Sequence, residues 1–354
     1  MKTHKWLLPA SWIYGLAVAV RNRMFDGGLL SSRRFDIPVI SVGNLAVGGT
    51  GKTPHVEYLV RLLQSKRYVA VLSRGYKRKT SGFVLAGPDS TALDIGDEPM
   101  QIHRKFPDIT VAADANRCHG IDTLLATPFT QATDVVLLDD AYQHRYVKPG
   151  LSILLLEYSR LSGDLLMPAG RLREPWSQRC RADIIIVTKC PSGMTAGDYT
   201  EAAGIANPLP HQKLYFSTME YGQIYPVAGG NPLSSDAFDG QNVLLLTGIA
   251  NPTPLIEEVK RHASQVRHLA WTDHHQYSEG DISKAAAMFR QLPEPKIAVT
   301  TEKDATRLAT LPLPEDLSNH LYSLPITVKI TNGGKESFDN TVRQYVETGQ
   351  VPQQ

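Results

Sequence analysis

One stretch near the amino terminus has residue types and spacing suited to binding phosphate. It reads Ala46-Val47-Gly48-Gly49-Thr50-Gly51-Lys52-Thr53. The apolar run Ile37–Val42 precedes it, and a helical pattern begins at Pro54. In a strand, glycine-rich loop and helix, backbone N–H groups surround phosphate oxygens, a lysine reaches the β- and γ-phosphates, and a threonine ligates Mg²⁺. The stretch therefore predicts a phosphate-binding loop, and a glycine-rich turn without a ligand is the alternative.

Two adjacent carboxylates form a candidate second part of the same site. Asp139 and Asp140 follow the apolar run Val135–Leu138. A continuous apolar run is typical of a buried parallel strand, which would deliver both acids at its carboxyl end. An acid in that place binds the Mg²⁺ of a nucleotide in phosphate-loop enzymes, whereas an aspartate-capped turn is the simpler alternative. The two features together favour a nucleoside triphosphate and Mg²⁺ as ligands.

Length and composition describe an ordinary globular protein. The chain has 354 residues, enough for two domains with separate cores. Its formal net charge of +2 gives no reason to expect nucleic acid as a partner, and no obligate protein partner is evident. The three cysteines are widely spaced without a metal-ligand pairing, so reduced thiols in a cytosolic compartment are expected.

Positive charge is concentrated in residues 1–34. This segment holds six lysines and arginines against one aspartate, a net of +5, which leaves −3 for the remainder. Its apolar stretch Leu7–Val20 would rise only about 21 Å as a helix, short of the ~30 Å hydrocarbon core. No small-residue cleavage site follows before Arg21, which argues against a signal peptide. We expect an amphipathic helix in the interface of an anionic membrane, and a helix packed on the protein's own core is the alternative.

Alternating strands and helices indicate an α/β fold. Near-continuous apolar strands are expected at Val69–Ser73, Ile109–Ala112, Val135–Leu138, Ile153–Leu156 and Ile184–Val187. Separated by helix-length segments, such strands form a mostly parallel sheet with helices on both faces, as in P-loop NTPases. Ligands of these sheets bind beyond the carboxyl ends of the strands.

The pattern changes near residue 210. Lys213–Ser217 and Gln223–Val227 flank Tyr221-Gly222, which predicts a β-hairpin. Further apolar strands are expected at Val243–Gly248 and Ile297–Thr301. The predicted organisation is a basic region at 1–34, a P-loop core at 35–210, a hairpin and linker at 211–240, and a smaller α/β domain at 241–354.

Several polar loops could supply catalytic groups. Asp97 and Glu98 precede a helical run, where capping explains a pair of acids as well as catalysis does. Phosphoryl transfer to a hydroxyl nevertheless needs a carboxylate to accept the proton. In the pair Asp273-His274 the acid could orient the histidine as a base. The alternative is that His274 is an exposed loop histidine without such a role. Arg171 lies in a proline-bracketed loop suited to gripping phosphate, with a solvated loop as the alternative.

A set of short motifs resembles one family. In order along the chain they are Ser41-Val42-Gly43-Asn44-Leu45, the phosphate loop, Ser73-Arg74-Gly75-Tyr76, Gly96-Asp97-Glu98-Pro99, Asp114-Ala115-Asn116-Arg117, Leu138-Asp139-Asp140 with Gln143-His144, Pro168-Ala169-Gly170-Arg171-Leu172-Arg173-Glu174-Pro175, Asp273-His274 and Thr301-Glu302-Lys303-Asp304. Together they closely resemble tetraacyldisaccharide 4′-kinase, the lipid A 4′-kinase family of Gram-negative bacteria. The resemblance extends over nearly the whole chain.

The resemblance implies an enzyme at the cytoplasmic face of the inner membrane. It would move the γ-phosphoryl of ATP to the 4′-hydroxyl of a tetraacylated glucosamine disaccharide 1-phosphate, with Mg²⁺. Asp97 is implied as the base and His274 as its support. The same resemblance implies the acids Asp139 and Asp140 as the Mg²⁺ site, with Glu98 near it.

Further implications concern the substrate. By the same resemblance, Asn116, Arg117 and Arg171 contact substrate or phosphate. The chain departs from the usual family pattern at Lys77 and at Ala141-Tyr142, and Ala46 replaces the first glycine of the phosphate loop. None of these changes removes a reacting group.

Two other classes remain as hypotheses. A regulatory or metallochaperone GTPase would share the phosphate loop, yet Val187-Thr188-Lys189-Cys190-Pro191 lacks the aspartate of a guanine-reading Asn-Lys-x-Asp motif. A non-catalytic membrane-binding module would explain residues 1–34 but would leave Lys52 and Asp97 unexplained. Preference between ATP and GTP tests the first hypothesis, and turnover with a lipid disaccharide tests the second.

Overall fold

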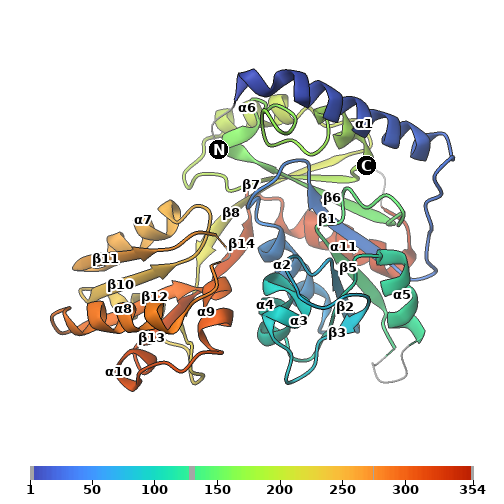
Figure 1. Cartoon of the computed structure of the whole chain (residues 1–354). Coiled ribbons are helices and arrows are strands. Elements are labelled where there is room, and N and C mark those ends of the chain that lie inside the picture. Colours follow the sequence, from blue (N-terminus) through green and yellow to red (C-terminus); the bar gives the residue numbers. More distant parts are fainter. Residues whose placement is uncertain (1–3, 127–131, 274, 352–354) are drawn as a thin grey trace. The chain divides into compact units, whose positions relative to one another are not determined.

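The computed structural model describes residues 4–126, 132–273 and 275–351 (Figure 1). The chain divides into two compact units. Unit 1 comprises Met1–Met219 and Val328–Gln354, and unit 2 comprises Glu220–Thr327. The larger unit carries the phosphate loop.

A nine-stranded sheet forms the centre of unit 1, in the order β14-β8-β7-β6-β1-β5-β2-β4-β3. Its strands are β1 (Val39–Asn44), β2 (Val69–Ser73), β3 (Val84–Leu85), β4 (Thr110–Ala113), β5 (Val135–Asp139), β6 (Leu151–Glu157), β7 (Ile184–Thr188), β8 (Lys213–Tyr221) and β14 (Ile326–Ile330). Strand β1 pairs in parallel with both β5 and β6, and β3 pairs antiparallel with β4. The predicted mostly parallel sheet is therefore confirmed.

Helices cover both faces of this sheet (Figure 1). They are α1 (Leu8–Asp26), α2 (Lys52–Leu63), α3 (Ala92–Ile95), α4 (Asp97–Lys105), α5 (Arg117–Ala126), α6 (Ala196–Ala206) and α11 (Lys335–Thr348), with short 3₁₀ turns at Lys5–Leu7, Tyr158–Arg160 and Trp176–Arg181. Strand β5 illustrates why its residues are continuously apolar. Val135 and Leu137 pack in the cluster with α2 and α11, whereas Val136 and Leu138 pack in the cluster with α5. A strand buried on both faces needs apolar side chains at every position.

The predicted hairpin at 213–227 is wrong. Strand β8 pairs in parallel with β7, in register from Ile184 opposite Lys213 to Val187 opposite Phe216. The short strand β9 (Tyr225–Pro226) instead pairs antiparallel with β13 (Leu321–Leu324). The turn at Tyr221-Gly222 favoured a local hairpin, but β8 buries Tyr215 and Phe216 by extending the parallel sheet after the α6 crossover.

The end of the chain also differs from the predicted smaller domain at 241–354. Residues from Val328 onward belong to unit 1, because β14 joins the large sheet beside β8 and α11 packs on its core. The buried Tyr345 hydroxyl donates to the Val39 carbonyl oxygen at 3.1 Å and accepts from the Val39 N–H at 3.0 Å. The sequence of a carboxyl-terminal helix can show that the helix is amphipathic, but it does not show which sheet the helix covers.

Unit 2 is a smaller α/β unit around a five-stranded sheet, in the order β11-β10-β12-β13-β9. Besides β9 and β13 its strands are β10 (Asn242–Thr247), β11 (Gln265–Ala270) and β12 (Lys296–Thr301). Its helices are α7 (Thr253–His262), α8 (Glu279–Arg290), α9 (Glu302–Leu308) and α10 (Glu315–Ser318), with a 3₁₀ turn at Ser235–Phe238. Residues 220–240 of the predicted hairpin and linker are thus part of this unit.

Candidate active site

The phosphate loop lies between β1 and α2, as predicted. Gly48 and Gly51 have φ values of +111° and +91°, a region that side chains with a Cβ rarely adopt. Gly51 is the N-cap of α2, so the free N–H groups at the start of that helix face the loop. Gly48 and Gly49 are exposed, which leaves their backbone accessible to an anion.

Three hydrogen bonds fix the loop from different elements. The Asn44 amide, fully buried at the end of β1, donates to Thr50 Oγ1 at 2.8 Å. Thr188 Oγ1 at the end of β7 donates to the Thr50 carbonyl oxygen at 2.9 Å. The Val47 N–H donates to the Arg171 carbonyl oxygen at 2.8 Å. The backbone of Arg171, a predicted substrate contact, therefore holds the loop, and this residue also has a further interaction partner.

A buried histidine under the loop was missed by sequence reasoning. His55 Nδ1 is 2.7 Å from the Gly51 carbonyl oxygen, and its Nε2 is 3.0 Å from Ser217 Oγ on β8. Burial lowers the pKa of His55 to about 4, although the bond to Gly51 acts in the opposite direction. The ring is therefore neutral at pH 7, with Nδ1–H donating to Gly51 and Nε2 accepting from Ser217. It ties the end of the phosphate loop to the sheet.

Because His55 is buried in its neutral form, we expect the folding stability of unit 1 to fall in acid. The pKa of His55 lies below the ~6.5 of an unfolded chain, so the unfolded state binds the extra proton. Stability is fully present above about pH 6.5 and falls by roughly 3 kcal/mol as the pH approaches 4. Urea unfolding at several pH values should show a smaller fall for His55→Gln than for the parent. The same substitution at exposed His211 is the control, and equal pH dependence in all three proteins would contradict the assignment.

Asp140 is held by two cations. Arg173 Nη1 lies 3.1 Å from both carboxylate oxygens, and Lys52 Nζ lies 3.7 Å from Oδ1. Burial acts to raise the pKa of Asp140, but Lys52 and Arg173 outweigh it, so the pKa is lowered. Asp140 has a φ of +47°, so the chain turns sharply where β5 ends. No pattern in the sequence indicates that Arg173 contacts Asp140.

Asp139 lies beside it in a different environment. Its side chain is buried, and neither carboxylate oxygen has a hydrogen-bond partner among the described residues. Burial is the largest cause that raises the pKa of Asp139, to about 7, and the negative charges of Glu98 and Asp140 act in the same direction. A buried carboxylate without a donor suits a cation, so Asp139, Asp140 and Thr53 fit Mg²⁺.

The protein groups alone would leave a cation incompletely coordinated. Within 4–126, 132–273 and 275–351, no three or more His, Cys, Asp or Glu side chains are grouped so that they could hold a metal ion. Mg²⁺ is commonly bound by one or two carboxylates plus substrate phosphates. The arrangement therefore suits a metal that arrives with a triphosphate.

Arg117 supports the acids from beneath. It is 1% exposed, and it donates to the carbonyl oxygens of Asp114 at 2.9 Å and Asp139 at 3.2 Å. Burial lowers the pKa of Arg117 to about 10, against the nearby acids. These contacts place the side chain behind Asp139 rather than in a position exposed to a substrate. Asn116, in contrast, is exposed just before α5.

Asp97 and Glu98 form the first turn of α4. Gly75 and Gly96 bring this turn against the loop after β2, since a Cβ on Gly96 would lie 3.1 Å from the Gly75 Cα. Both glycines have positive φ, +69° and +98°. Glu98 is close enough to raise the pKa of Asp139. Asp97 and Glu98 both have interaction partners in the structure.

His274 lies outside the described residues. Its neighbours belong to unit 2, where His275 Nε2 is 3.0 Å from Asp281 Oδ2 and Trp271 Nε1 donates to Asp281 Oδ1 at 2.8 Å. Asp281 also forms the capping box at the start of α8 with the N-cap residue Ser278. The chain on either side of His274 is thus anchored to this helix.

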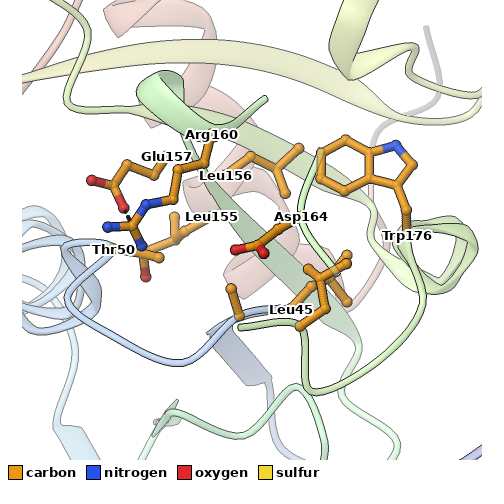
Figure 2. A pocket seen from close by; sticks show the side chains of 10 residues that line it. Leu45, Thr50, Leu155, Leu156, Glu157, Arg160, Asp164 and Trp176 are labelled. Carbon is orange, nitrogen blue, oxygen red and sulfur yellow. Dashed lines mark ion pairs between the residues drawn. The ribbon is translucent and has the colours of Figure 1, made fainter. Parts of the chain in front are cut away.

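A small cavity adjoins the phosphate loop (Figure 2). Its volume is about 30 Å³, and Ala46, Thr50 and Trp176 contribute to its lining. Arg160 Nη1 lies 3.1 Å from Glu157 Oε2 at its edge. The volume holds at most about two waters, so this cavity does not accommodate a nucleotide base.

The fold and site define a class. A parallel sheet whose central strand ends in a Gly-Lys-Thr loop, with acids at the end of the adjacent strand, is the arrangement of P-loop nucleoside-triphosphate enzymes. The family model of tetraacyldisaccharide-1-P 4′-kinase matches residues 3–347. The chain belongs to that family, which confirms the resemblance found in the sequence.

Individual relatives agree. Tetraacyldisaccharide 4′-kinase of Bacteroides thetaiotaomicron is 51% identical over 358 residues, with 98% of this chain and 94% of the relative covered. The enzyme of the same name from Porphyromonas gingivalis strain W83 is 44% identical, with 93% of each chain covered. The crystal structure of LpxK from Aquifex aeolicus in complex with ATP matches with a TM-score of 0.74 and 27% identity, over 97% of this chain and 98% of that chain.

Proposed function

We propose that this protein transfers the γ-phosphoryl group of ATP to the 4′-hydroxyl of tetraacyldisaccharide 1-phosphate, the lipid A precursor. The observation that carries the proposal is the meeting of Lys52 with Asp140 beside the phosphate loop. The identity of the acceptor is inferred from the family to which the chain belongs. The assignment of ATP as the phosphoryl donor is supported by the phosphate loop and the acids beside it.

The phosphate loop binds the triphosphate. Its backbone N–H groups and the start of α2 contact the β- and γ-oxygens, and Lys52 stabilises the charge that develops on the transferred group. Thr53, Asp139 and Asp140 hold Mg²⁺, which neutralises phosphate charge when bound. Arg117 and Arg173 keep the two acids in place.

Asp97 accepts the proton of the 4′-hydroxyl. Its carboxylate lies in the first turn of α4, which Gly75 and Gly96 bring against the loop after β2. His274 assists this proton transfer, and Glu98 acts near the metal. Asn116 and Arg171 contact the anionic part of the acceptor, whereas Arg117 acts through Asp139.

A GTPase of regulatory or metallochaperone type is not favoured. At the end of β7, where the guanine-reading motif would follow, Thr188 is occupied with the phosphate loop and no aspartate follows Lys189 within two residues. Steady-state assays with a lipid disaccharide 1-phosphate should show phosphate transfer from ATP at a kcat/KM at least about tenfold above that with GTP. The opposite preference would favour the GTPase.

Helix α1 presents an unusual distribution of side chains. Its buried residues include polar Ser11 and Asn22, whereas Trp12, Ile13 and Leu16 are 71%, 72% and 66% exposed. Among the described residues no helix is long and apolar enough to span a bilayer. An outward apolar face ending in arginines suits the interface of an anionic membrane. This face supports our proposal that the protein binds the cytoplasmic face of the inner membrane, where the proposed lipid acceptor would lie.

A single charge on that face should weaken membrane binding. Ile13→Glu removes an apolar side chain worth about 1.5–3 kcal/mol of burial and adds repulsion from anionic lipid. We expect at least a tenfold lower partition onto phosphatidylglycerol vesicles in sedimentation assays. Ile205→Glu changes an exposed isoleucine on α6 and is the matched control. Parent-like sedimentation of Ile13→Glu would mean that another surface binds the membrane.

A further inference from the structure

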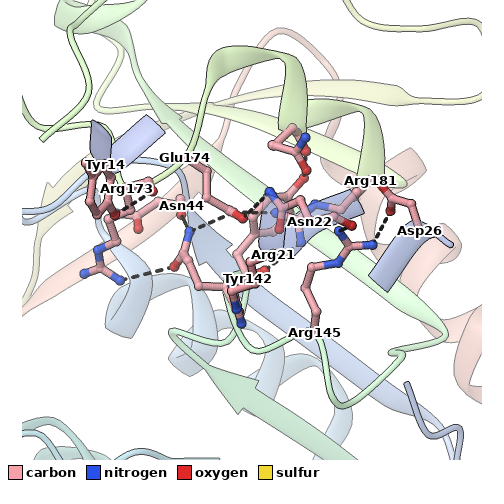
Figure 3. A network of polar contacts seen from close by, with 12 residues as sticks. Tyr14, Arg21, Asn22, Asp26, Asn44, Tyr142, Arg145, Arg173, Glu174 and Arg181 are labelled. Atoms are coloured by element: carbon pink, nitrogen blue, oxygen red, sulfur yellow. Dashed lines mark hydrogen bonds and ion pairs between the residues drawn. The ribbon is translucent and has the colours of Figure 1, made fainter. Parts of the chain in front are cut away.

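The inward face of α1 bonds to the loops that flank the acid pair (Figure 3). The Tyr14 hydroxyl donates to the Arg173 carbonyl oxygen at 2.8 Å. Arg21 Nη2 donates to the Gln143 carbonyl oxygen at 2.8 Å. The next residue along the helix, Asn22, donates from Nδ2 to Glu174 Oε1 at 3.1 Å.

The partners of α1 lie one or two hydrogen bonds from Asp140 and the phosphate loop. The side chain of Arg173 donates to both oxygens of Asp140. Gln143 Nε2 donates to the Asn44 carbonyl oxygen at 2.8 Å, and the Asn44 amide holds Thr50 of the phosphate loop. A continuous set of hydrogen bonds therefore runs from α1 to the phosphate loop and to Asp140.

Asn22 and Glu174 are both buried, so the Glu174 carboxylate depends on its hydrogen-bond donors. The two residues are 2% and 1% exposed. Glu174 Oε2 accepts from Arg181 and, at 3.3 Å, from Gln143, whereas Oε1 accepts from Asn22. A buried carboxylate must be paired and hydrogen-bonded, and losing one donor favours rearrangement of the others. Glu174 is adjacent to Arg173, so such a rearrangement would reach Asp140.

We propose that Asn22 and Tyr14 are positioning residues for the nucleotide site. The helix then has two tasks on opposite faces: its outward face binds the membrane, and its inward face holds Arg173 and Gln143 where Asp140 and the phosphate loop need them. The proposal rests on the proposed function only in taking those groups as the Mg²⁺–ATP site. Seating of α1 on a membrane is thereby linked to the geometry at which phosphate is transferred.

The test measures Mg²⁺–ATP binding by calorimetry, which needs neither lipid nor turnover. Asn22→Leu, of similar size, and Tyr14→Phe, which removes one hydroxyl, should each raise Kd for Mg²⁺–ATP about three- to tenfold. Tyr68→Phe, at an exposed tyrosine before β2, should leave Kd unchanged. Sedimentation with anionic vesicles should stay at the parent level for all three variants.

The outcomes separate positioning from stability. A purely structural role would lower the thermal midpoint of Asn22→Leu without changing Kd at a temperature where the protein is folded. Parent-like Kd for folded Asn22→Leu and Tyr14→Phe would overturn the proposal. If Asn22→Leu does not fold, Tyr14→Phe alone decides, because it leaves the buried carboxylate intact. If the parent binds Mg²⁺–ATP but phosphorylates no lipid, the proposed function fails while this comparison still stands.

Discussion

Replacing Lys52 by alanine is expected to abolish phosphoryl transfer. The ammonium group is 3.7 Å from Asp140 Oδ1, and its side chain is only 11% exposed, so it acts where water screens little. Without it, two carboxylates would face the triphosphate with one cation fewer, and the charge on the transferred group would lose its stabilising partner. We expect kcat/KM for ATP to fall by roughly 10³ or more in steady-state assays.

The control for Lys52→Ala is Lys66→Ala. Lys66 is exposed just beyond α2, so its loss removes a similar charge from the same region without touching the loop. Circular dichroism should show both variants folded. Turnover of Lys52→Ala within a few fold of the parent would remove the lysine from the mechanism.

Asp97→Asn should lower kcat by roughly 10²–10⁴ while KM for ATP changes little. The amide has the shape of the carboxylate but cannot take the proton of the attacking hydroxyl. Asparagine is also acceptable at the start of a helix, so α4 should persist. The measurement is a steady-state titration of both substrates, which separates kcat from the two KM values.

Exposed Asp89 provides the matched substitution, Asp89→Asn, which should behave as the parent. A large rise in KM for ATP with kcat retained would indicate that Asp97 serves nucleotide binding. An unchanged kcat would show that another group accepts the proton.

Local patterns made much of unit 1 predictable. Val135–Leu138 is apolar at each position because β5 is buried on both faces, and the Gly-Lys-Thr loop is encoded in consecutive residues. Parallel neighbours end at the same edge of a sheet, so β1 and β5 necessarily bring the phosphate loop near Asp139. The sequence is therefore sufficient to predict that the strand, the phosphate loop and the two acids lie together.

Contacts between distant segments were not predictable. Tyr345 reaches Val39 across 306 positions, and Asn22 reaches Glu174 across 152. The sequence shows that α11 is amphipathic, but its apolar face could pack equally well against several apolar surfaces of the protein. The same reason explains the hairpin error, because a turn signal at Tyr221-Gly222 says nothing of the vacant sheet edge beside β7.

The roles of buried polar residues were also not predictable from the sequence. His55 sits in a helix where its spacing suggests an ordinary core position, and only its two hydrogen bonds reveal that it anchors the phosphate loop. Arg173 is one of two arginines in the loop 168–175, and only the structure shows that its guanidinium donates to both carboxylate oxygens of Asp140. Such roles depend on which way a side chain points.

The most direct measurement combines γ-labelled ATP, Mg²⁺ and a purified tetraacyldisaccharide 1-phosphate. We expect the label to appear in the lipid, with phosphorus NMR locating the new ester at position 4′ of the non-reducing sugar, and Lys52→Ala to give none. Label released only as inorganic phosphate, or found at any other hydroxyl, would contradict the account.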